Sequence, residues 1–372
     1  MVVVIGGGGA GLYFSAAYKL NNPEEKVIVI EEHENIGKPV QCTGILTREI
    51  LKLLPENEVN KFKINEIADA EIHSPNNMFT TPIDSDIIID NVAFVEHLAQ
   101  KAQNAGVEIK TGHKYLGNDG NSIKIRNIKT KEIFETKTNN LIGADGPSSI
   151  VAKNNDLYNK RSFLTGIQAR VKIKDLNSRK IIFYPYIGEY AWLAPEGEEY
   201  ARIGVAAKSN AKLLFDNFIK KFPGKIEEIQ GGPIPLHRPG IKVQQIVKKN
   251  RVSEQGFVVS LLGDAALQIK NTTGGGIIPG LNAAKALSKG FNTYNTELKP
   301  LNRELLVHYY MNKALNNYSD KDWDRLINKV NNPKIKMILL KTNRDEAKKM
   351  LFKLLTKPNM LIEGLRAGIK TL

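Results

Sequence analysis

Cysteine is almost missing from this sequence, because Cys42 is the single one among 372 residues. One cysteine excludes an intramolecular disulfide bond and a four-cysteine zinc site within one chain. Runs of about 18 consecutive apolar residues are also missing, so we expect no membrane-spanning helix. These absences favour a reducing, cytoplasmic compartment. At 42% hydrophobic residues, the composition is that of a folded globular protein of two to three domains.

Acidic residues are in short supply, with 39 Asp and Glu against 53 Lys and Arg, a formal net charge of +14. Such an excess either forms a solvated surface or meets an anionic partner. Zinc-finger spacing, an RNP-type aromatic strand and a helix-turn-helix pattern are all missing, so nucleic acid is not an expected partner. Lysines alternate with apolar residues along 334–372, a pattern that can lie on an anionic membrane or pack onto the protein. We expect a monomer that contacts the membrane peripherally.

The first thirty residues have the pattern of a βαβ unit. Residues 2–5 and 27–30 are continuous apolar runs, as in parallel strands buried on both faces. Between them, Gly6, Gly8 and Gly11 satisfy G-x-G-x-x-G and lead into a predicted helix that extends to residue 20. Because this motif follows a strand and opens a helix, it predicts a dinucleotide-binding turn rather than an ordinary glycine-rich loop.

Each residue of this turn has a physical role. Gly6 permits the tight turn, Gly8 lets the backbone approach a pyrophosphate, and Gly11 lets helix and strand pack closely. The helix N-terminus presents free N–H groups to the phosphates. Glu31, 20 residues after Gly11, can accept hydrogen bonds from ribose hydroxyls. An acid there disfavours a 2′-phosphate, so we do not expect NADP in this pocket.

Two later apolar strands also end in a glycine and an aspartate. One leads into Gly143-Ala144-Asp145-Gly146 and the other into Gly263-Asp264. Either aspartate can cap the helix that follows it. Alternatively, Asp264 can bind ribityl hydroxyls and Asp145 can fix the turn near a diphosphate. The three motifs in this order predict an α/β fold with an FAD-binding Rossmann-type domain of the para-hydroxybenzoate-hydroxylase type.

The remaining pattern divides the chain into three parts. Strict alternation of apolar and polar residues from 168 to 174, continued near 180–184, 190–193 and 200–206, predicts an antiparallel sheet. We therefore predict a discontinuous FAD-binding domain in 1–165 and 250–300. An inserted antiparallel substrate domain is expected in 166–249, and a helical C-terminal region in 301–372.

Three stretches resemble the geranylgeranyl reductases, including the archaeal digeranylgeranylglycerophospholipid reductases. They are Ile36 to Gly44, Tyr190 to Pro195, and Gly263 to Ile277 with its Thr-Thr-Gly-Gly-Gly run. The resemblance spans about residues 1–300. It implies an FAD enzyme that saturates the double bonds of isoprenoid chains on ether lipids. The sequence departs from the family pattern at Asn91, Ala194, Leu267 and Asn271, where the family usually has Arg, Phe, Gly and Pro.

The resemblance also implies roles for individual residues. It places Cys42 beside the isoalloxazine, where the thiol can deliver or relay a proton, or can be a small buried residue. Tyr190 and Trp192, two apart on one strand face, can line an isoprenoid tunnel, contact the flavin or pack in the core. The backbone of the glycine run can approach the flavin, and the following helix can stabilise negative charge on it. We therefore assign to the cofactor Thr273, Gly274, Gly275, Gly276 and Ile277.

Other functions on this fold stay open. An FAD-dependent monooxygenase or halogenase has the same architecture, although a halogenase normally has a Trp-rich motif that this sequence lacks. A hydroxylase normally has Pro in place of Asn271. A third alternative is an electron-carrying flavoprotein that docks a redox partner through its basic surface. With no second nucleotide motif, the electron donor is either NAD(P)H or a ferredoxin-like protein.

Overall fold

A six-stranded sheet forms the centre of the nucleotide-binding part of the molecule. The computed structural model describes residues 1–247 and 256–371. The strand order is β16-β17-β10-β1-β2-β6, parallel except for β16. The strands are β1 (Val2–Ile5), β2 (Val27–Ile30), β6 (Glu108–Lys110), β10 (Asn140–Gly143), β16 (Gln244–Val247) and β17 (Phe257–Leu261). Every residue of β1 and β2 is buried, as their continuous apolar sequence predicts.

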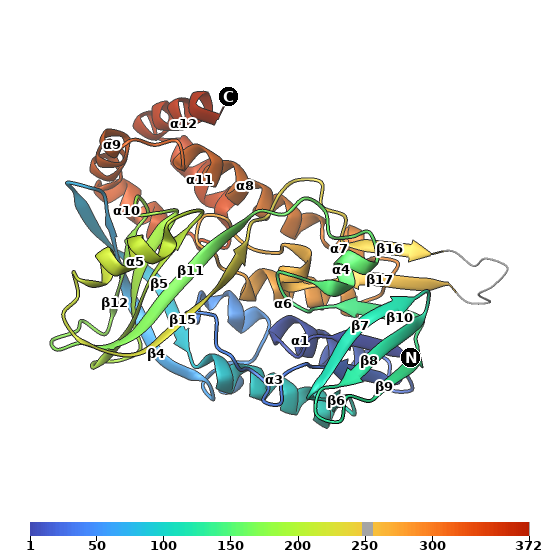
Figure 1. Cartoon of the computed structure of the whole chain (residues 1–372). Coiled ribbons are helices and arrows are strands. Elements are labelled where there is room, and N and C mark those ends of the chain that lie inside the picture. The colour runs from blue at the N-terminus through green and yellow to red at the C-terminus, as the bar shows by residue number, and fades with distance from the viewer. Residues whose placement is uncertain (248–255, 372) are drawn as a thin grey trace.

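Three helices pack together beside this sheet: α1 (Gly9–Asn21), α3 (Asn91–Asn104) and α6 (Ile277–Ser288). A three-stranded sheet contributes to the same core (Figure 1). Its strands are β7 (His113–Asp119), β8 (Ser122–Asn127) and β9 (Ile133–Lys137), and α4 (Ile150–Asn154) contacts β7. The chain leaves this unit twice, for residues 45–89 and 163–235, and returns to it at α3 and at β16.

The second large sheet has the order β15-β11-β14-β13-β12-β4-β5-β3 and is antiparallel except for the β12–β4 pair. Its strands are β3 (Ile45–Leu46), β4 (Lys63–His73), β5 (Met78–Ile89), β11 (Phe163–Lys172), β12 (Lys180–Tyr184), β13 (Tyr190–Pro195), β14 (Tyr200–Ala207) and β15 (Lys225–Pro235). Helix α5 (Ala211–Ile219) packs on β11 and β14. Two short helices connect β3 to β4 within this sheet: η1 (Arg48–Lys52) and α2 (Glu56–Val59).

This sheet is larger than the one expected from sequence. It also contains β3, β4 and β5, which lie before residue 90 and outside the predicted inserted domain. The four alternating segments predicted between 168 and 206 correspond to β11, β12, β13 and β14, which pair antiparallel as expected, and β15, which was not predicted, adds a strand beside β11. Residues 244–247, which we assigned to the inserted domain, pair instead with β17 in the first sheet. The predicted boundary between residues 249 and 250 lies outside the described residues. The division into domains as such stays a prediction.

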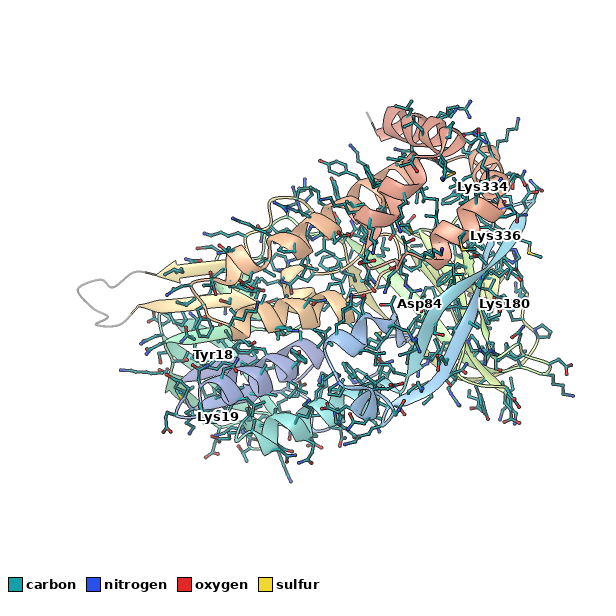
Figure 2. The ribbon with its side chains drawn as sticks, turned by 180° about the vertical axis from the view of Figure 1, so that it is seen from behind. Tyr18, Lys19, Asp84, Lys180, Lys334 and Lys336 are labelled. Atoms are coloured by element: carbon teal, nitrogen blue, oxygen red, sulfur yellow. The ribbon has the colours of Figure 1, made fainter. Side chains whose placement is uncertain are left out.

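The C-terminal region is helical, as expected, and it lies along both sheets (Figure 1). After η2 (Gly263–Ala266) and α6, it comprises α7 (Tyr294–Glu297), α8 (Lys299–Leu315), α9 (Asp320–Val330), α10 (Pro333–Leu340), α11 (Ala347–Leu355) and α12 (Pro358–Thr371). Helices α9 and α10 pack on β5, and α11 and α12 pack on α8. Figure 2 shows Lys334 and Lys336 of α10 beside the strands of the second sheet. This region is therefore part of the folded body.

Candidate functional site

The glycine turn between β1 and α1 is built as the motif predicts. Gly6 has φ +107°, and a Cβ there would lie 2.2 Å from the carbonyl oxygen of Ala144. A Cβ on Gly11 would lie 2.4 Å from the carbonyl oxygen of Gly6. Gly8 is different, because no described atom lies within 4 Å of its Cβ position. Gly6 and Gly11 are thus required by the fold itself, whereas Gly8 keeps a surface open to a ligand.

Glu31 closes the turn from the end of β2. Its Oε2 accepts a hydrogen bond of 2.7 Å from the backbone N–H of Gly7. Its Oε1 accepts from the backbone N–H of His33 at 2.8 Å, and lies 2.6 Å from Nδ1 of the same residue. A carboxylate has about four lone-pair sites. Glu31 therefore holds the turn in place and still has acceptor capacity for a hydroxyl group.

Two helix N-termini at the site lack a capping side chain. Helix α1 begins after Gly8 and α6 begins after Gly276, and neither has an acidic residue in its first turn. Their first N–H groups have no partner within the helix. Each N-terminus therefore presents donors and partial positive charge toward an anionic or electron-rich group.

Asp145 and Asp264, which follow similar strand-and-glycine motifs, have different environments. Asp145 accepts hydrogen bonds from the hydroxyl of Ser149 at 2.6 Å and from the backbone N–H groups of Ile150 and Val151 at 2.7 and 3.1 Å. It therefore stabilises the start of α4, which is the capping role we gave as its alternative. Burial raises the pKa of Asp145. The side chain therefore fixes the turn between β10 and α4.

Asp264 keeps its carboxylate free. Among the described residues we find no hydrogen bond to its side chain, and its Oδ1 is 3.1 Å from the Cβ position of Gly276. Burial raises the pKa of Asp264 to about 6, and Arg161 acts in the opposite direction. Asp264 thus lies at the start of α6 as an acceptor without a donor. Its carboxylate oxygens can therefore accept hydrogen bonds from a ligand hydroxyl group.

Cys42 lies in a loop that two long-range contacts fix. Its carbonyl oxygen accepts from the Asn91 amide at 2.8 Å and from the Arg202 guanidinium at 2.7 Å. Its Sγ accepts from the N–H of Gly44 at 3.4 Å. Burial raises the pKa of the thiol, Arg202 lowers it, and Asp264 raises it further. The thiol therefore keeps its proton near neutral pH.

Tyr190 and Trp192 lie side by side on β13, as their spacing predicts, with ring centroids 5.8 Å apart. Each is 7% exposed. The Tyr190 hydroxyl and the Trp192 Nε1 have no hydrogen-bond partner among the described residues. The Tyr190 oxygen lies 2.0 Å from the Cβ position of Gly274, so only glycine fits there. Two buried donors without partners mark a place where a ligand can supply acceptors.

The Thr-Thr-Gly-Gly-Gly segment forms a tight turn before α6. The N–H of Gly274 donates to the carbonyl of Lys270 at 2.8 Å, and the N–H of Lys270 donates to the carbonyl of Gly275 at 3.2 Å. Gly274 has φ +65°. The turn therefore brings the backbone of residues 273–276 beside both Tyr190 and Asp264.

The four residues that depart from the family pattern lie in different local environments. The Asn271 side chain accepts from the N–H of His237 at 2.7 Å and donates to its carbonyl at 2.9 Å. Leu267 has φ +54°, a left-handed conformation in which glycine is the least strained residue. Asn91 is buried and holds the Cys42 carbonyl. Ala194 is fully buried in β13.

Two residues of the site were not foreseen. Arg161 donates to the carbonyls of Pro147 at 2.8 Å and Ala265 at 2.7 Å, so it joins the Asp145 and Asp264 turns. Arg202 joins β14 to the Cys42 loop. Their partners lie 14 and 104 residues from Arg161, and 160 residues from Arg202. No local sequence pattern signals contacts at the two larger separations.

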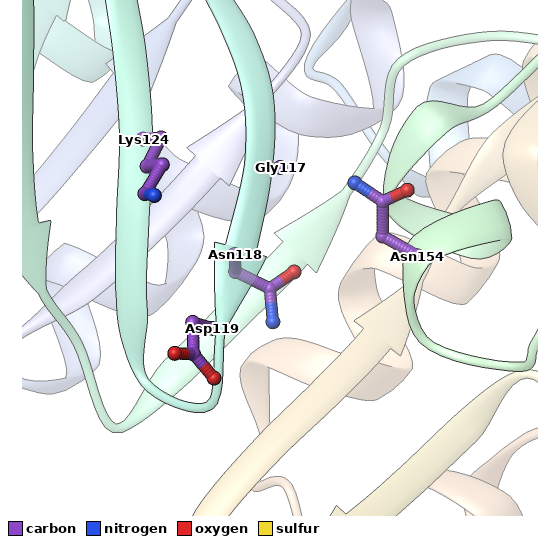
Figure 3. A pocket seen from close by; sticks show the side chains of 5 residues that line it. All are labelled: Gly117, Asn118, Asp119, Lys124 and Asn154. Carbon is purple, nitrogen blue, oxygen red and sulfur yellow. The ribbon is translucent and has the colours of Figure 1, made fainter.

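A separate surface hollow of about 390 Å³ lies between the β7–β8 hairpin and α4. Its lining residues come from both elements (Figure 3). They are Gly117, Asn118, Asp119, Lys124 and Asn154. None of them belongs to the residues predicted for the site. The Asn118 amide already donates to the side chain of Asn155 and to the carbonyl of Gly120.

Comparison with known sequences supports the resemblance. No protein-family model matches the chain. A digeranylgeranylglycerophospholipid reductase from Thermoplasma acidophilum is 26% identical over 86% of each chain. Relatives of the same name from Methanosphaera stadtmanae and Methanocaldococcus jannaschii are each 29% identical. The first match covers 95% of this chain and 97% of the relative, and the second covers 87% and 89%. The predicted resemblance to these reductases is thereby confirmed.

Comparison with solved structures shows the fold. A geranylgeranyl bacteriochlorophyll reductase-like protein from Thermoplasma acidophilum superposes with a TM-score of 0.78 at 22% identity, covering 98% of both chains. A flavin-dependent brominase superposes with a TM-score of 0.63 at 16% identity, covering 99% of this chain and 98% of its own. The predicted α/β fold of the FAD-binding Rossmann type is confirmed.

Proposed function

We propose that this chain, which is similar to the digeranylgeranylglycerophospholipid reductases along most of its length, is an FAD-dependent reductase. Its substrates are the isoprenoid double bonds of membrane ether lipids or of their precursors. The observation that carries the proposal is that unsatisfied groups meet at one place. Within the described part of the chain, they are the start of α6, the carboxylate of Asp264, and the donors of Tyr190 and Trp192, which have no hydrogen-bond partner there.

The residues present fit FAD. Glu31 would accept from ribose hydroxyls, the N-terminus of α1 above Gly8 would receive the diphosphate, and Asp264 would accept from ribityl hydroxyls. The backbone of residues 273–277 would contact the ring, with the positive end of α6 toward its negative charge. Asp145 fixes the adjoining turn. Bound and reduced, FAD supplies a hydride.

The reaction also needs a proton, and the site has a donor for it. An isolated alkene has no carbonyl to accept electron density, so a proton must reach the second carbon before or with the hydride. Cys42 is our candidate for this catalytic role, because burial keeps its thiol protonated. Tyr190, whose pKa burial also raises, is a second donor, and Trp192 would form an apolar wall.

The C-terminal helices would bring the enzyme to its lipid substrate. None of the described helices is long and apolar enough to cross a bilayer. Helices α11 and α12 expose the side chains of Phe352 (73%), Leu361 (46%) and Leu365 (63%). Lys348 is exposed one turn before Phe352. Apolar residues beside lysines suit peripheral contact with an anionic membrane.

For the electron donor we keep the two alternatives expected from the sequence, NAD(P)H and a ferredoxin-like protein. The fold that the chain shares with the flavin-dependent brominase makes an oxygen-dependent enzyme the second candidate. One experiment separates the two functions. The purified protein is reduced without oxygen and then mixed with either an unsaturated isoprenoid ether lipid or oxygen. Reoxidation coupled to lipid saturation supports the reductase, whereas hydroxylated or halogenated product formed only with oxygen contradicts it.

A further inference from the structure

The turn at residues 270–276 is held by side chains of the C-terminal region. The ammonium group of Lys270 forms an ion pair with Asp345, which lies between α10 and α11. The carbonyl of Asn271 accepts from Asn312 of α8 at 3.3 Å. The hydroxyl of Thr272 lies 2.7 Å from Nδ1 of His308, also of α8. Three consecutive residues of the turn thus contact a region 36 to 75 positions further along the chain.

The Lys270–Asp345 pair is the charged member of this set. Both side chains are buried, with exposures of 7% and 8%. The Lys270 chain folds over Gly275, whose Cβ position would be 2.8 Å from the lysine Cε. Asp345 also accepts from the hydroxyl of Thr47. The pair therefore joins the turn, the C-terminal region and the segment just before η1.

The ionic surroundings of the pair are balanced. A second pair, Arg344 with Asp86, lies beside it. Burial lowers the pKa of Lys270, and Asp345 acts against this effect. Burial disfavours the charged form of Asp345 as well, yet Lys270 holds the pKa of that carboxyl below its ordinary value. Removing either partner alone would leave a buried charge without compensation.

We infer that Lys270 and Asp345 are positioning residues that fix both the place and the net charge of the turn at 270–276. The C-terminal helical region thereby tunes the reduction potential of the flavin that this turn contacts. The inference rests on the proposed function, since it concerns the same cofactor. Its physical basis is that reduced flavin is more negative than oxidised flavin. An uncompensated positive charge at the turn therefore favours the reduced form, and an uncompensated negative charge favours the oxidised form.

A double-mutant cycle tests this inference. Asp345→Asn keeps the size of the side chain and removes its charge, and Lys270→Gln removes the opposite charge. The measured quantity is the ratio of the dissociation constants of oxidised and reduced FAD, obtained from FAD titrations and dye-equilibrated potentials. We expect Asp345→Asn to raise this ratio by about tenfold, a potential shift of about 30 mV upward. Lys270→Gln should lower it by a similar factor, and the double variant should return near the unsubstituted value.

Glu363→Gln is the matched control. Glu363 is 2% exposed and forms ion pairs with Arg325, Lys329 and Arg366 within the C-terminal region, and none of its ion-pair partners lies in the turn. It should lower thermal stability without changing the ratio. If Asp345→Asn does not fold, Lys270→Gln still tests the inference, because it should lower the ratio of the two dissociation constants.

The outcomes are distinct. FAD binding with ratios that stay unchanged, or that move in the same direction in both single variants, overturns the inference alone. A shift with Glu363→Gln as large as that with Asp345→Asn also overturns it, because the effect would then be one of general stability. Failure of the unsubstituted protein to bind FAD overturns the proposed function, and this inference falls with it.

Discussion

At the scale of single residues, Gly8 is a position where a substitution should affect cofactor binding without affecting folding. The protein leaves the space above its Cα open, and its φ of −82° suits any L-residue. We therefore predict that Gly8→Val folds with nearly unchanged stability and loses FAD, because the branched side chain occupies the space of the diphosphate. Gly197→Val is the matched control, since Gly197 also has no neighbour within 4 Å of its Cβ position. FAD absorbance after purification and thermal unfolding of both variants check this. Full FAD content in folded Gly8→Val would contradict the assignment of the turn.

Asp264 should make the free energy of unfolding of the cofactor-free protein depend on pH. Burial raises its pKa to about 6 in the folded chain, against about 3.9 in an unfolded chain. A carboxyl whose pKa is higher in the folded than in the unfolded chain binds its proton more tightly in the folded chain. The free energy of unfolding is therefore highest while the group is protonated, and it falls as pH rises from about 4 through 6. In cofactor-free protein, Asp264→Asn should therefore gain up to about 2 kcal/mol over the unsubstituted chain between roughly pH 4 and pH 7.

Denaturant unfolding at the two pH values measures this difference. FAD should remove it, because ligand hydroxyl groups stabilise the ionised carboxylate. A stability difference that does not change with pH would show that Asp264 is already satisfied within the protein.

Substituting Cys42 tests whether its thiol is the proton donor. We predict that Cys42→Ser keeps the fold and FAD but slows alkene saturation by about a hundredfold or more, the usual effect of losing a general acid. The carbonyl contacts of Asn91 and Arg202 involve only the backbone of residue 42, so the loop should hold. Rapid-mixing measurement of flavin reoxidation by lipid checks this. Reoxidation at the unsubstituted rate would transfer the role to Tyr190 or to an ordered water.

At the scale of elements, the nucleotide-binding unit was predictable because its signals are local. Continuous apolar strands and glycines at fixed spacing placed β1, α1, β2 and β17 within a few residues of their observed bounds. Strands β4 and β5 were missed. Register shifts after Lys63 and Ile67 break the alternation of β4, and Pro82 interrupts β5. Periodicity of two residues is therefore not visible there.

In the candidate site, too, local motifs predicted some residues, whereas residues placed by contacts between distant segments were not predicted. Motif residues such as Gly6 and Asp264 carry their signal in sequence. Asp145 does not reveal from sequence whether it caps a helix or binds a ligand, because both roles need an acceptor before a helix. The holding roles of Arg202 and Asp345 depend on contacts between distant segments, which no spacing rule provides.

At the scale of the whole molecule, the basic charge and the exposed apolar side chains of α11 and α12 predict salt-sensitive membrane binding. Leu365→Ser should weaken co-sedimentation with anionic vesicles. Leu213→Ser on α5, an equally exposed leucine at 61% against 63%, should leave it unchanged. Binding should fall steeply with salt, since lysine attraction of about 1 kcal/mol per residue is screened within roughly 8 Å. Equal binding to neutral and anionic vesicles would contradict the electrostatic contribution.

We propose that the molecule saturates isoprenoid double bonds with electrons from a flavin. The most direct test of this proposal is a single turnover without oxygen, in which photoreduced, FAD-loaded protein is mixed with a geranylgeranyl ether phospholipid and the lipid mass is measured. We predict that each flavin reoxidised adds two hydrogen atoms to one lipid. When reduction and turnover are both carried out in heavy water, both added atoms should be deuterium, because the hydrogen on N5 of reduced flavin exchanges with solvent. Flavin that stays reduced, or reoxidises while the lipid mass is unchanged, would contradict the proposed function.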